Sequence, residues 1–455
     1  MPNLRLNSRP GPLPAALAAC GLVALVSLAA PIEPLYDPWA WLVWGRELTG
    51  LDLDTSAGPS WKPLPVLLVA PLTLFGDTAA DLWLALARFG WLAVPVFAWR
   101  LASRLEGGGR WAPAAGALAA LAVVVAADDV TSWARQGAGG LSEPLLAALV
   151  LGAIEAGLAR RGQLALGLAL AASLLRPETW PFAAAYAWYE VRAGRLVPGV
   201  AVLAGALVAA LWFVPDILGA GNALEGAGRA RGADNSPLEV LGWAVAMPPV
   251  VVWAGVLAGL WPWRGRLPGP APLLAAAAGA WIALVAVMAA AGYAGLPRFM
   301  APAIAVLCAV GAAGLVRAVG ELPARRALAT ATVVAAALGA QAAARLADVP
   351  RELDRVREDS AAIAALGDLA EADPRAFVGC GELWTSEFGS QTALAWHLDL
   401  AIAEVVATGT IAPPDGRLVV GPQTSASLAR RMRAQRPPLA AGEGWQVFGT
   451  GACTR

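Results

Sequence analysis

Long apolar runs separated by short polar segments make up the first three quarters of the chain. A helix that crosses the hydrocarbon core of a membrane needs about 20 apolar residues. The runs predict about eleven such helices. They lie near residues 12–32, 81–100, 111–127, 141–159, 163–175, 179–190, 196–215, 241–262, 271–291, 299–317 and 327–346.

Two apolar stretches contain breaks. Residues 64–76 are short for a span and are interrupted by Pro65 and Pro71, so we expect a helix lying at the membrane interface. Residues 163–190 contain Arg176-Pro177-Glu178 at their centre. Proline breaks helices and a bare Arg–Glu pair is costly in hydrocarbon, so two short helices should meet there.

The arginines support this arrangement, because cytoplasmic loops are enriched in Lys and Arg. One set of loops collects Arg100, Arg104, Arg110, Arg160, Arg161, Arg192, Arg195, Arg264, Arg266, Arg317, Arg325 and Arg326, on the same side as Arg5 and Arg9. We therefore expect a multi-pass protein of the plasma membrane with a cytoplasmic N-terminus. The acidic and Gly-rich segments would then all face outward: 33–63, 128–140, 176–178, 216–240, 292–298 and 347–455.

Composition agrees with this fold class, an α-helical polytopic membrane protein. The chain is 58% hydrophobic and 15% charged, with a mean hydropathy of +0.60, whereas soluble proteins have about 25% charged residues. The formal net charge is zero. A nucleic-acid partner is not expected, because its site would need clustered cations.

The polar tail predicts a second domain. We divide the chain into a membrane domain, 1–346, whose first outer loop spans 33–80, and a small extracytoplasmic α/β domain, 347–455. The runs AFVGC, RLVVG and WQVFG are expected as strands, and SASLARRMRAQ as a helix. Cys380 and Cys453 both lie in this tail, which suggests a disulfide if the domain is in an oxidising compartment.

The first outer loop carries the best candidates for chemistry. Asp37 follows the first helix, beside Tyr36 and several tryptophans, so partial desolvation would make it a stronger base; alternatively it caps a helix that starts at Pro38. Trp61 precedes Lys62, the only lysine in 455 residues, and both Trp61 and Tyr36 are expected to line the site or to have a structural role beside it. The compact ammonium of Lys62 suits a phosphate, although a lysine at the interface can also simply extend toward water.

Other charges gather at the same predicted face. Arg298 follows a Gly-rich turn and a proline, where it suits a phosphate or extends toward the headgroups. Asp128, Asp129 and Glu143 are candidates for orienting an acceptor or a metal. Arg176 and Glu178 are expected to line the site or to form a buried pair that holds helices together.

The motifs resemble those of the multi-spanning GT-C glycosyltransferases, most closely the protein mannosyltransferase and aminoarabinose transferase branch. The resemblance rests on Asp37 after the first helix, W-K-P-L-P at 61–65, S-E-P-L-L at 142–146, L-L-R-P-E at 174–178 and L-P-R-F at 296–299, and covers roughly residues 12–320. Members take a sugar from a polyprenyl- or dolichyl-phosphate donor on the extracytoplasmic side and invert its anomeric centre.

The resemblance implies roles. Asp37 would deprotonate the acceptor hydroxyl, and Lys62 and Arg298 would hold the donor phosphate. Many relatives have two adjacent acids in the first loop, whereas Pro38 follows Asp37 here, so Asp128 or Asp129 is the candidate for the second acid. Expected partners are a polyprenyl-phosphate sugar, membrane lipid, and a glycan, lipid or protein acceptor. No cofactor is certain; Mg or Mn held by carboxylates is possible, since a single histidine makes zinc a poor fit.

Two other function classes remain open from the sequence. A transporter or lipid flippase would show inverted repeats and polar residues at mid-membrane depth. A non-catalytic membrane scaffold would leave Asp37, Lys62 and Arg298 scattered and solvated. The decisive observation is therefore whether these three side chains line one site.

Overall fold

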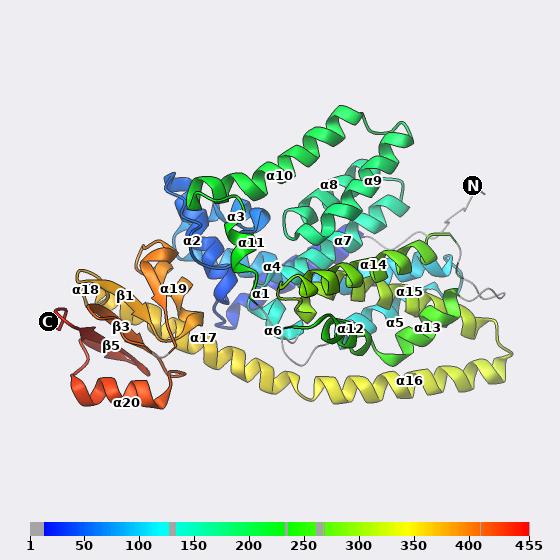
Figure 1. The fold of residues 1–455 in the computed structure, drawn as a ribbon. Coiled ribbons are helices and arrows are strands. Elements are labelled where there is room, and N and C mark those ends of the chain that lie inside the picture. Colours follow the sequence, from blue (N-terminus) through cyan, green and yellow to red (C-terminus); the bar gives the residue numbers. More distant parts are fainter. Residues whose placement is uncertain are drawn as a thin grey trace.

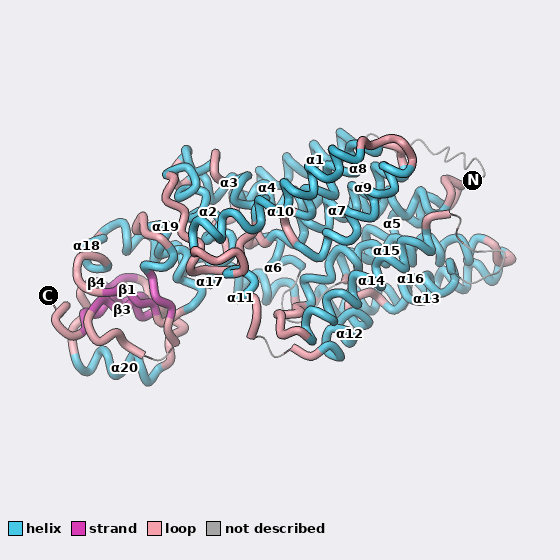
Figure 2. The backbone as a smooth tube through the Cα atoms, turned by 45° about the horizontal axis from the view of Figure 1, so that its top comes forward, coloured by secondary structure: helices cyan, strands magenta, loops and turns pink. Residues whose placement is uncertain are grey.

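The computed structural model describes residues 13–454, apart from 127–132, 233–234, 261–266, 268 and 410. A helical bundle makes up most of the molecule, and a small domain with a sheet lies at one end (Figures 1 and 2). The helices are α1 (Leu13–Val26), α2 (Tyr36–Gly50), α3 (Pro63–Val69), α4 (Thr78–Glu106), α5 (Ala112–Val125), α6 (Trp133–Ala138), α7 (Ser142–Leu158), α8 (Gly162–Ser173), α9 (Trp180–Arg192), α10 (Pro198–Ala220), α11 (Glu225–Arg229), α12 (Pro237–Ala246), α13 (Val250–Leu260), α14 (Ala271–Ala290), α15 (Ala301–Gly320), α16 (Ala324–Leu346), α17 (Val349–Ala372), α18 (Pro374–Phe377), α19 (Gln391–His397) and α20 (Ala426–Gln435).

The helices of the bundle follow the predicted apolar runs, and the expected polytopic helical fold is confirmed. Within the described residues, five helices are long and apolar enough to cross a membrane, or six if one bent pair counts as a span. The predicted count of about eleven is not confirmed, because α1, α5 and α8 are shorter apolar helices. As expected, α8 and α9 are separate short helices on either side of Arg176, and 64–76 contains only the short α3 and a 3-10 turn, Leu72–Phe75.

The single helix predicted over 241–262 is wrong. The structure has two helices here, α12 and α13, which meet at an angle of 88°. Pro248 and Pro249 lie at the break. Neither proline has an N–H to donate, and each ring obstructs the preceding helical turn, so the helix cannot continue through them.

Helix α15 is the centre of the bundle, and its residues 301–315 are all buried. It packs closely against α13 through glycines. A Cβ atom on Gly255 or Gly314 would collide with the backbone of the opposite helix. Small residues therefore let these two backbones approach closely, which is the usual way in which helices associate in a membrane.

The C-terminal part forms a five-stranded mixed sheet in the order β2-β1-β3-β5-β4. The strands are β1 (Glu382–Thr385), β2 (Val405–Ala407), β3 (Gly416–Val420), β4 (Ala440–Gly442) and β5 (Trp445–Thr450). The predictions of strands at RLVVG and WQVFG and of a helix at SASLARRMRAQ are confirmed by β3, β5 and α20. The predicted strand AFVGC is wrong: its first residues end the short helix α18, because Pro374 at the first helical position favours a helical turn.

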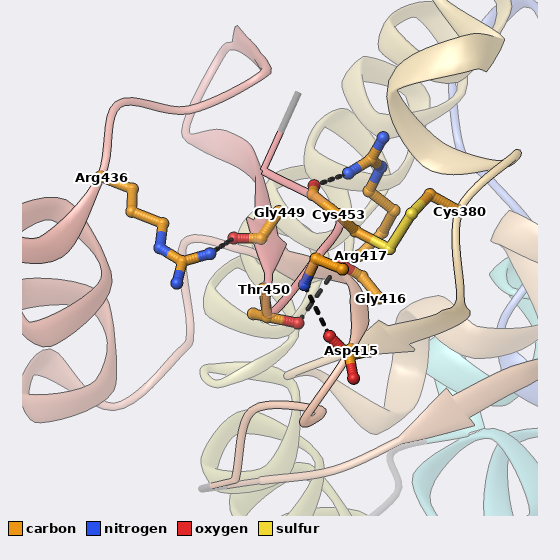
Figure 3. Close-up of a disulfide and its surroundings, with 9 residues drawn as sticks. Cys380, Asp415, Gly416, Arg417, Arg436, Gly449, Thr450 and Cys453 are labelled. Atoms are coloured by element: carbon orange, nitrogen blue, oxygen red, sulfur yellow. Dashed lines mark hydrogen bonds between the residues drawn. A yellow bond between two sulfur atoms is a disulfide. The ribbon is translucent and has the colours of Figure 1, made fainter.

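The predicted disulfide is present. Cys380 precedes β1 and Cys453 follows β5, and their sulfur atoms are bonded (Figure 3). Arg417 of β3 donates a hydrogen bond to the carbonyl oxygen of Cys453. The disulfide therefore connects the segment that precedes β1 with the segment that follows β5.

Helix α2 of the first loop shares a hydrophobic core with the C-terminal domain. Trp39 and Leu42 belong to the same buried cluster as Leu366, Trp396 and Trp445. The bundle beyond has its own cluster, built from helices such as α4, α7 and α15. The division at residue 346 remains a prediction, and the packing shows that α2 belongs with both parts of the molecule.

Candidate functional site

Asp37 lies in the first turn of α2. The helix begins at Tyr36, with Leu35 as its N-cap and no side-chain capping bond. The alternative that Asp37 caps a helix starting at Pro38 is therefore wrong. The carboxylate is free to point at Lys62 instead: its Oδ2 atom lies 3.6 Å from the lysine Nζ.

Lys62 is the N-cap of α3, just before Pro63. The residue is 8% exposed. Its Nζ donates a hydrogen bond to Ser142 Oγ at 3.0 Å, lies 5.1 Å from the centroid of the Trp41 ring and lies 3.6 Å from Oε1 of Glu143. The compact ammonium thus lies in a narrow space between α2 and α7, and does not extend to open water.

Glu143 is the centre of the cluster. It lies in the first turn of α7 and is completely buried. Its Oε1 atom lies 3.6 Å from Lys62 Nζ, 3.3 Å from Arg176 Nη1 and 3.6 Å from Arg298 Nε. A buried carboxylate is stable only when it is paired and hydrogen-bonded. Three cations from distant parts of the chain therefore converge on one side chain.

The two arginines differ in how firmly they are held. Arg176 forms a 2.7 Å ion pair with Glu178, and its guanidinium lies 3.4 Å from the centroid of Phe299. Arg298, in the 3-10 turn Pro297–Met300 before α15, pairs with Glu143 at 3.6 Å and lies 5.6 Å from the centroid of the Phe299 ring, and its Nε has no hydrogen-bond partner. Arg176 is thus a fixed structural cation, whereas Arg298 has donor capacity left.

The remaining predicted residues lie around this cluster. Tyr36 precedes Asp37 and donates its hydroxyl hydrogen to Gln391 Oε1 at 2.8 Å. Burial raises the pKa of Tyr36, and the nearby Asp37 raises it further, so the phenol stays a hydrogen-bond donor. Trp61 packs against Trp44 with ring centroids 5.5 Å apart. Asp128 and Asp129 lie outside the described residues.

Three members of the cluster were not singled out from the sequence. Ser142 precedes Glu143 in the S-E-P-L-L motif, Trp41 belongs to the aromatic run of the first loop, and Phe299 follows Arg298. Each lies one to four residues from a predicted site residue. Adjacency was the only signal that could have found them, because nothing in the sequence specifies which neighbour turns inward.

The fold is similar to that of solved structures. ArnT from Cupriavidus metallidurans matches with a TM-score of 0.58 in its complex with undecaprenyl phosphate and 0.57 in its apo state. Each match covers 95% of this chain and 97% of that chain, at 15% and 17% sequence identity respectively. The chain therefore has an ArnT-like fold. No protein-family model matches the sequence, and no curated protein matches it.

At this level of identity the likeness establishes the fold. The shared fold extends over the helical bundle and the small domain at its end, since each match covers 95% of this chain. The six charged side chains of the site (Asp37, Lys62, Glu143, Arg176, Glu178 and Arg298) are an observation on this chain itself. Together they carry three positive and three negative formal charges, so the cluster is balanced before any ligand enters.

Proposed function

We propose that the protein transfers a sugar from a polyprenyl-phosphate donor to an acceptor on the extracytoplasmic side, with inversion at the anomeric carbon. One observation carries the proposal: Asp37, Lys62 and Arg298 all belong to a single cluster around Glu143. A non-catalytic scaffold would leave these three side chains scattered. The undecaprenyl phosphate bound to ArnT, which shares the fold, supports a lipid phosphate as the donor group.

Lys62 and Arg298 are the proposed phosphate ligands. Both lie 3.6 Å from Glu143, which is a pairing distance rather than a tight hydrogen bond. A phosphate has more negative charge and more acceptor oxygens than one carboxylate, so it can draw both cations toward itself. Arg176 would keep its position when the phosphate binds, because Glu178 and Phe299 already hold its guanidinium.

A neighbouring groove suits the prenyl chain. A hollow of about 380 Å³ lies between α9 and α14 and is lined by Glu178, Trp180, Pro181, Leu284 and Met288, among others. Except for Glu178 its lining is apolar, and Glu178 is the partner of Arg176. An apolar hollow whose one charged lining residue pairs with Arg176 fits the hydrocarbon tail of a ligand whose anionic head binds the cations.

The chemistry follows from the arrangement. Asp37 would take the proton from the acceptor hydroxyl, whose oxygen then attacks the anomeric carbon from the face opposite the phosphate. A bond forms between the acceptor oxygen and that carbon as the carbon–oxygen bond to the phosphate breaks. The phosphate leaves with the bonding electrons, and Lys62 and Arg298 would stabilise its growing charge.

A divalent cation remains a prediction. The described residues include no group of three His, Cys, Asp or Glu side chains that could hold one, and Asp128 and Asp129 lie outside them. The ammonium of Lys62 lies between Asp37 and Glu143, so a metal would need ligands elsewhere. Transfer measured with and without EDTA tests this point.

The direct test uses the purified full chain in detergent. We expect it to bind undecaprenyl phosphate and to transfer radiolabelled sugar from a member of a panel of polyprenyl-phosphate sugars to material in membrane extracts. Asp37→Asn should keep the binding and reduce transfer to a small residual rate, whereas Lys62→Met and Arg298→Met should lose the binding. Absence of binding in the unmodified protein, or full transfer by Asp37→Asn, would overturn the proposal.

A further inference from the structure

In the first turn of α2, Trp39 packs against Trp396 of the C-terminal domain, and Tyr36 makes the polar contacts with that domain. The hydroxyl of Tyr36 donates to Gln391 Oε1 at 2.8 Å. Its carbonyl oxygen accepts a hydrogen bond from Thr392 Oγ1 at 2.9 Å. Its ring stacks on Phe388, with centroids 4.3 Å apart and an interplanar angle of 30°. Ring, hydroxyl and backbone of one residue are therefore all fixed by the same small domain.

The domain side of this contact is itself rigid. Thr392 is fully buried and Gln391 is 7% exposed. The amide of Gln391 donates through Nε2 to the carbonyl oxygen of Val405 in β2, which leaves its Oε1 directed at Tyr36. The hydrogen bond to Val405 therefore fixes the amide group of Gln391, and Gln391 in turn fixes the hydroxyl group of Tyr36 in the first turn of α2.

A second contact holds the far end of the same helix. Arg46 donates to the carbonyl oxygens of Trp396 and Leu400 at 3.1 and 2.7 Å and pairs with Asp399 at 3.0 Å. Arg46 lies nine residues beyond Asp37, about 13 Å along the helix axis. The two contacts can therefore be disturbed separately.

Asp37 directly follows Tyr36, and it has no capping or hydrogen-bonding role in α2 that would fix it. We propose that the C-terminal domain positions the Asp37 carboxylate against Lys62 through Tyr36, Gln391 and Thr392. These three are positioning residues, because none of them contacts the cation cluster. The inference rests on the proposed transfer reaction and adds to it a role for the C-terminal domain.

The test compares the two ends of α2. Tyr36→Phe keeps the ring stack and removes the hydroxyl, and Thr392→Val removes the other hydrogen bond with little change in shape. We expect the double variant to bind undecaprenyl phosphate as the unmodified protein does and to lower kcat for transfer about tenfold, because small displacements of a catalytic group are costly. Arg46→Lys, the matched control, should lower Tm and leave kcat within about twofold.

A second readout separates positioning from damage to the fold. In an Asp37→Asn background the Tyr36→Phe/Thr392→Val pair should change the residual transfer rate by less than about twofold, since the group that it positions has gone. An equal loss in both backgrounds, or a kcat unchanged by the pair, would overturn the inference. Failure of the proposed function itself has a different signature: the unmodified protein would neither bind undecaprenyl phosphate nor transfer sugar.

Discussion

Lys62 and Asp37 form an ion pair, with 3.6 Å between Nζ and Oδ2, although they are 25 residues apart in the sequence. Their side chains are only 10% and 17% exposed. Charges in such a partly desolvated place interact more strongly than they do in water. The proposed base and a proposed phosphate ligand are thereby held next to each other, as transfer between an acceptor hydroxyl and a phosphate ester requires.

The first prediction concerns the single lysine. Lys62→Arg keeps the charge but puts a longer, planar group into the space where Nζ meets Ser142 and the Trp41 ring. We expect the Kd for undecaprenyl phosphate to rise at least about tenfold, measured by microscale thermophoresis in detergent. Arg110→Lys, at an exposed arginine outside the cluster, is the control. If Lys62→Arg binds normally, the lysine is not needed for the phosphate.

The second prediction concerns Glu143. Glu143→Gln leaves Lys62, Arg176 and Arg298 with no shared counter-charge in a buried place, and breaking a buried pair costs about 3–5 kcal/mol. We expect a lower Tm, and a larger rise in Tm on adding undecaprenyl phosphate than the unmodified protein shows, because the anion replaces the missing charge. Glu352→Gln, in a surface pair with Arg355, should change Tm little. An unaltered Tm in Glu143→Gln would contradict this account.

The sequence predicted much of the bundle, because apolar runs of spanning length and charges at their ends are local signals. Asp37, Lys62 and Arg298 were found in this way. The role of Glu143 was not. It was expected to orient an acceptor or a metal, and it is instead the common partner of three cations. That role depends on how α7, α3 and α15 pack, which no single segment specifies.

The tryptophans of the first loop show a second limit. Trp is common at membrane interfaces, so the tryptophans near the predicted span end suit an interfacial position. In the structure Trp39, Trp41 and Trp44 are 2% exposed or less, and Trp39 packs into the core of the C-terminal domain. An aromatic residue near a span end suits both environments, so composition alone could not distinguish them.

The third prediction concerns pH. Burial, together with Asp81 and Asp368, raises the pKa of Glu33 from 4.5 to about 7. Between these values the folded state holds a proton that the unfolded state has lost, so this residue lowers stability as pH rises from about 4.5 to 7. Glu33→Gln removes this decrease in stability, because glutamine does not titrate. Its Tm relative to the unmodified protein should therefore increase across this range and then level off.

Differential scanning fluorimetry in detergent at a series of pH values would measure this difference. Glu358→Gln, at an exposed position of α17, is the control, because it removes a carboxylate that is not buried. A Glu33→Gln curve parallel to that of the unmodified protein would show that Glu33 titrates normally in the folded state.

The last prediction concerns the disulfide. Cys380 and Cys453 are 73 residues apart in sequence, and a cross-link of this length restricts the unfolded chain, typically stabilising by about 2–4 kcal/mol. Replacing both by serine should lower Tm, and dithiothreitol should lower the Tm of the unmodified protein toward that of the variant without affecting the variant. Cys20→Ser, at a free cysteine, should still respond to the reductant.

Reduction of the disulfide should also slow transfer, because the domain that contains it contacts Tyr36. A normal kcat in the reduced protein would show that the C-terminal domain keeps its contacts with α2 without the disulfide.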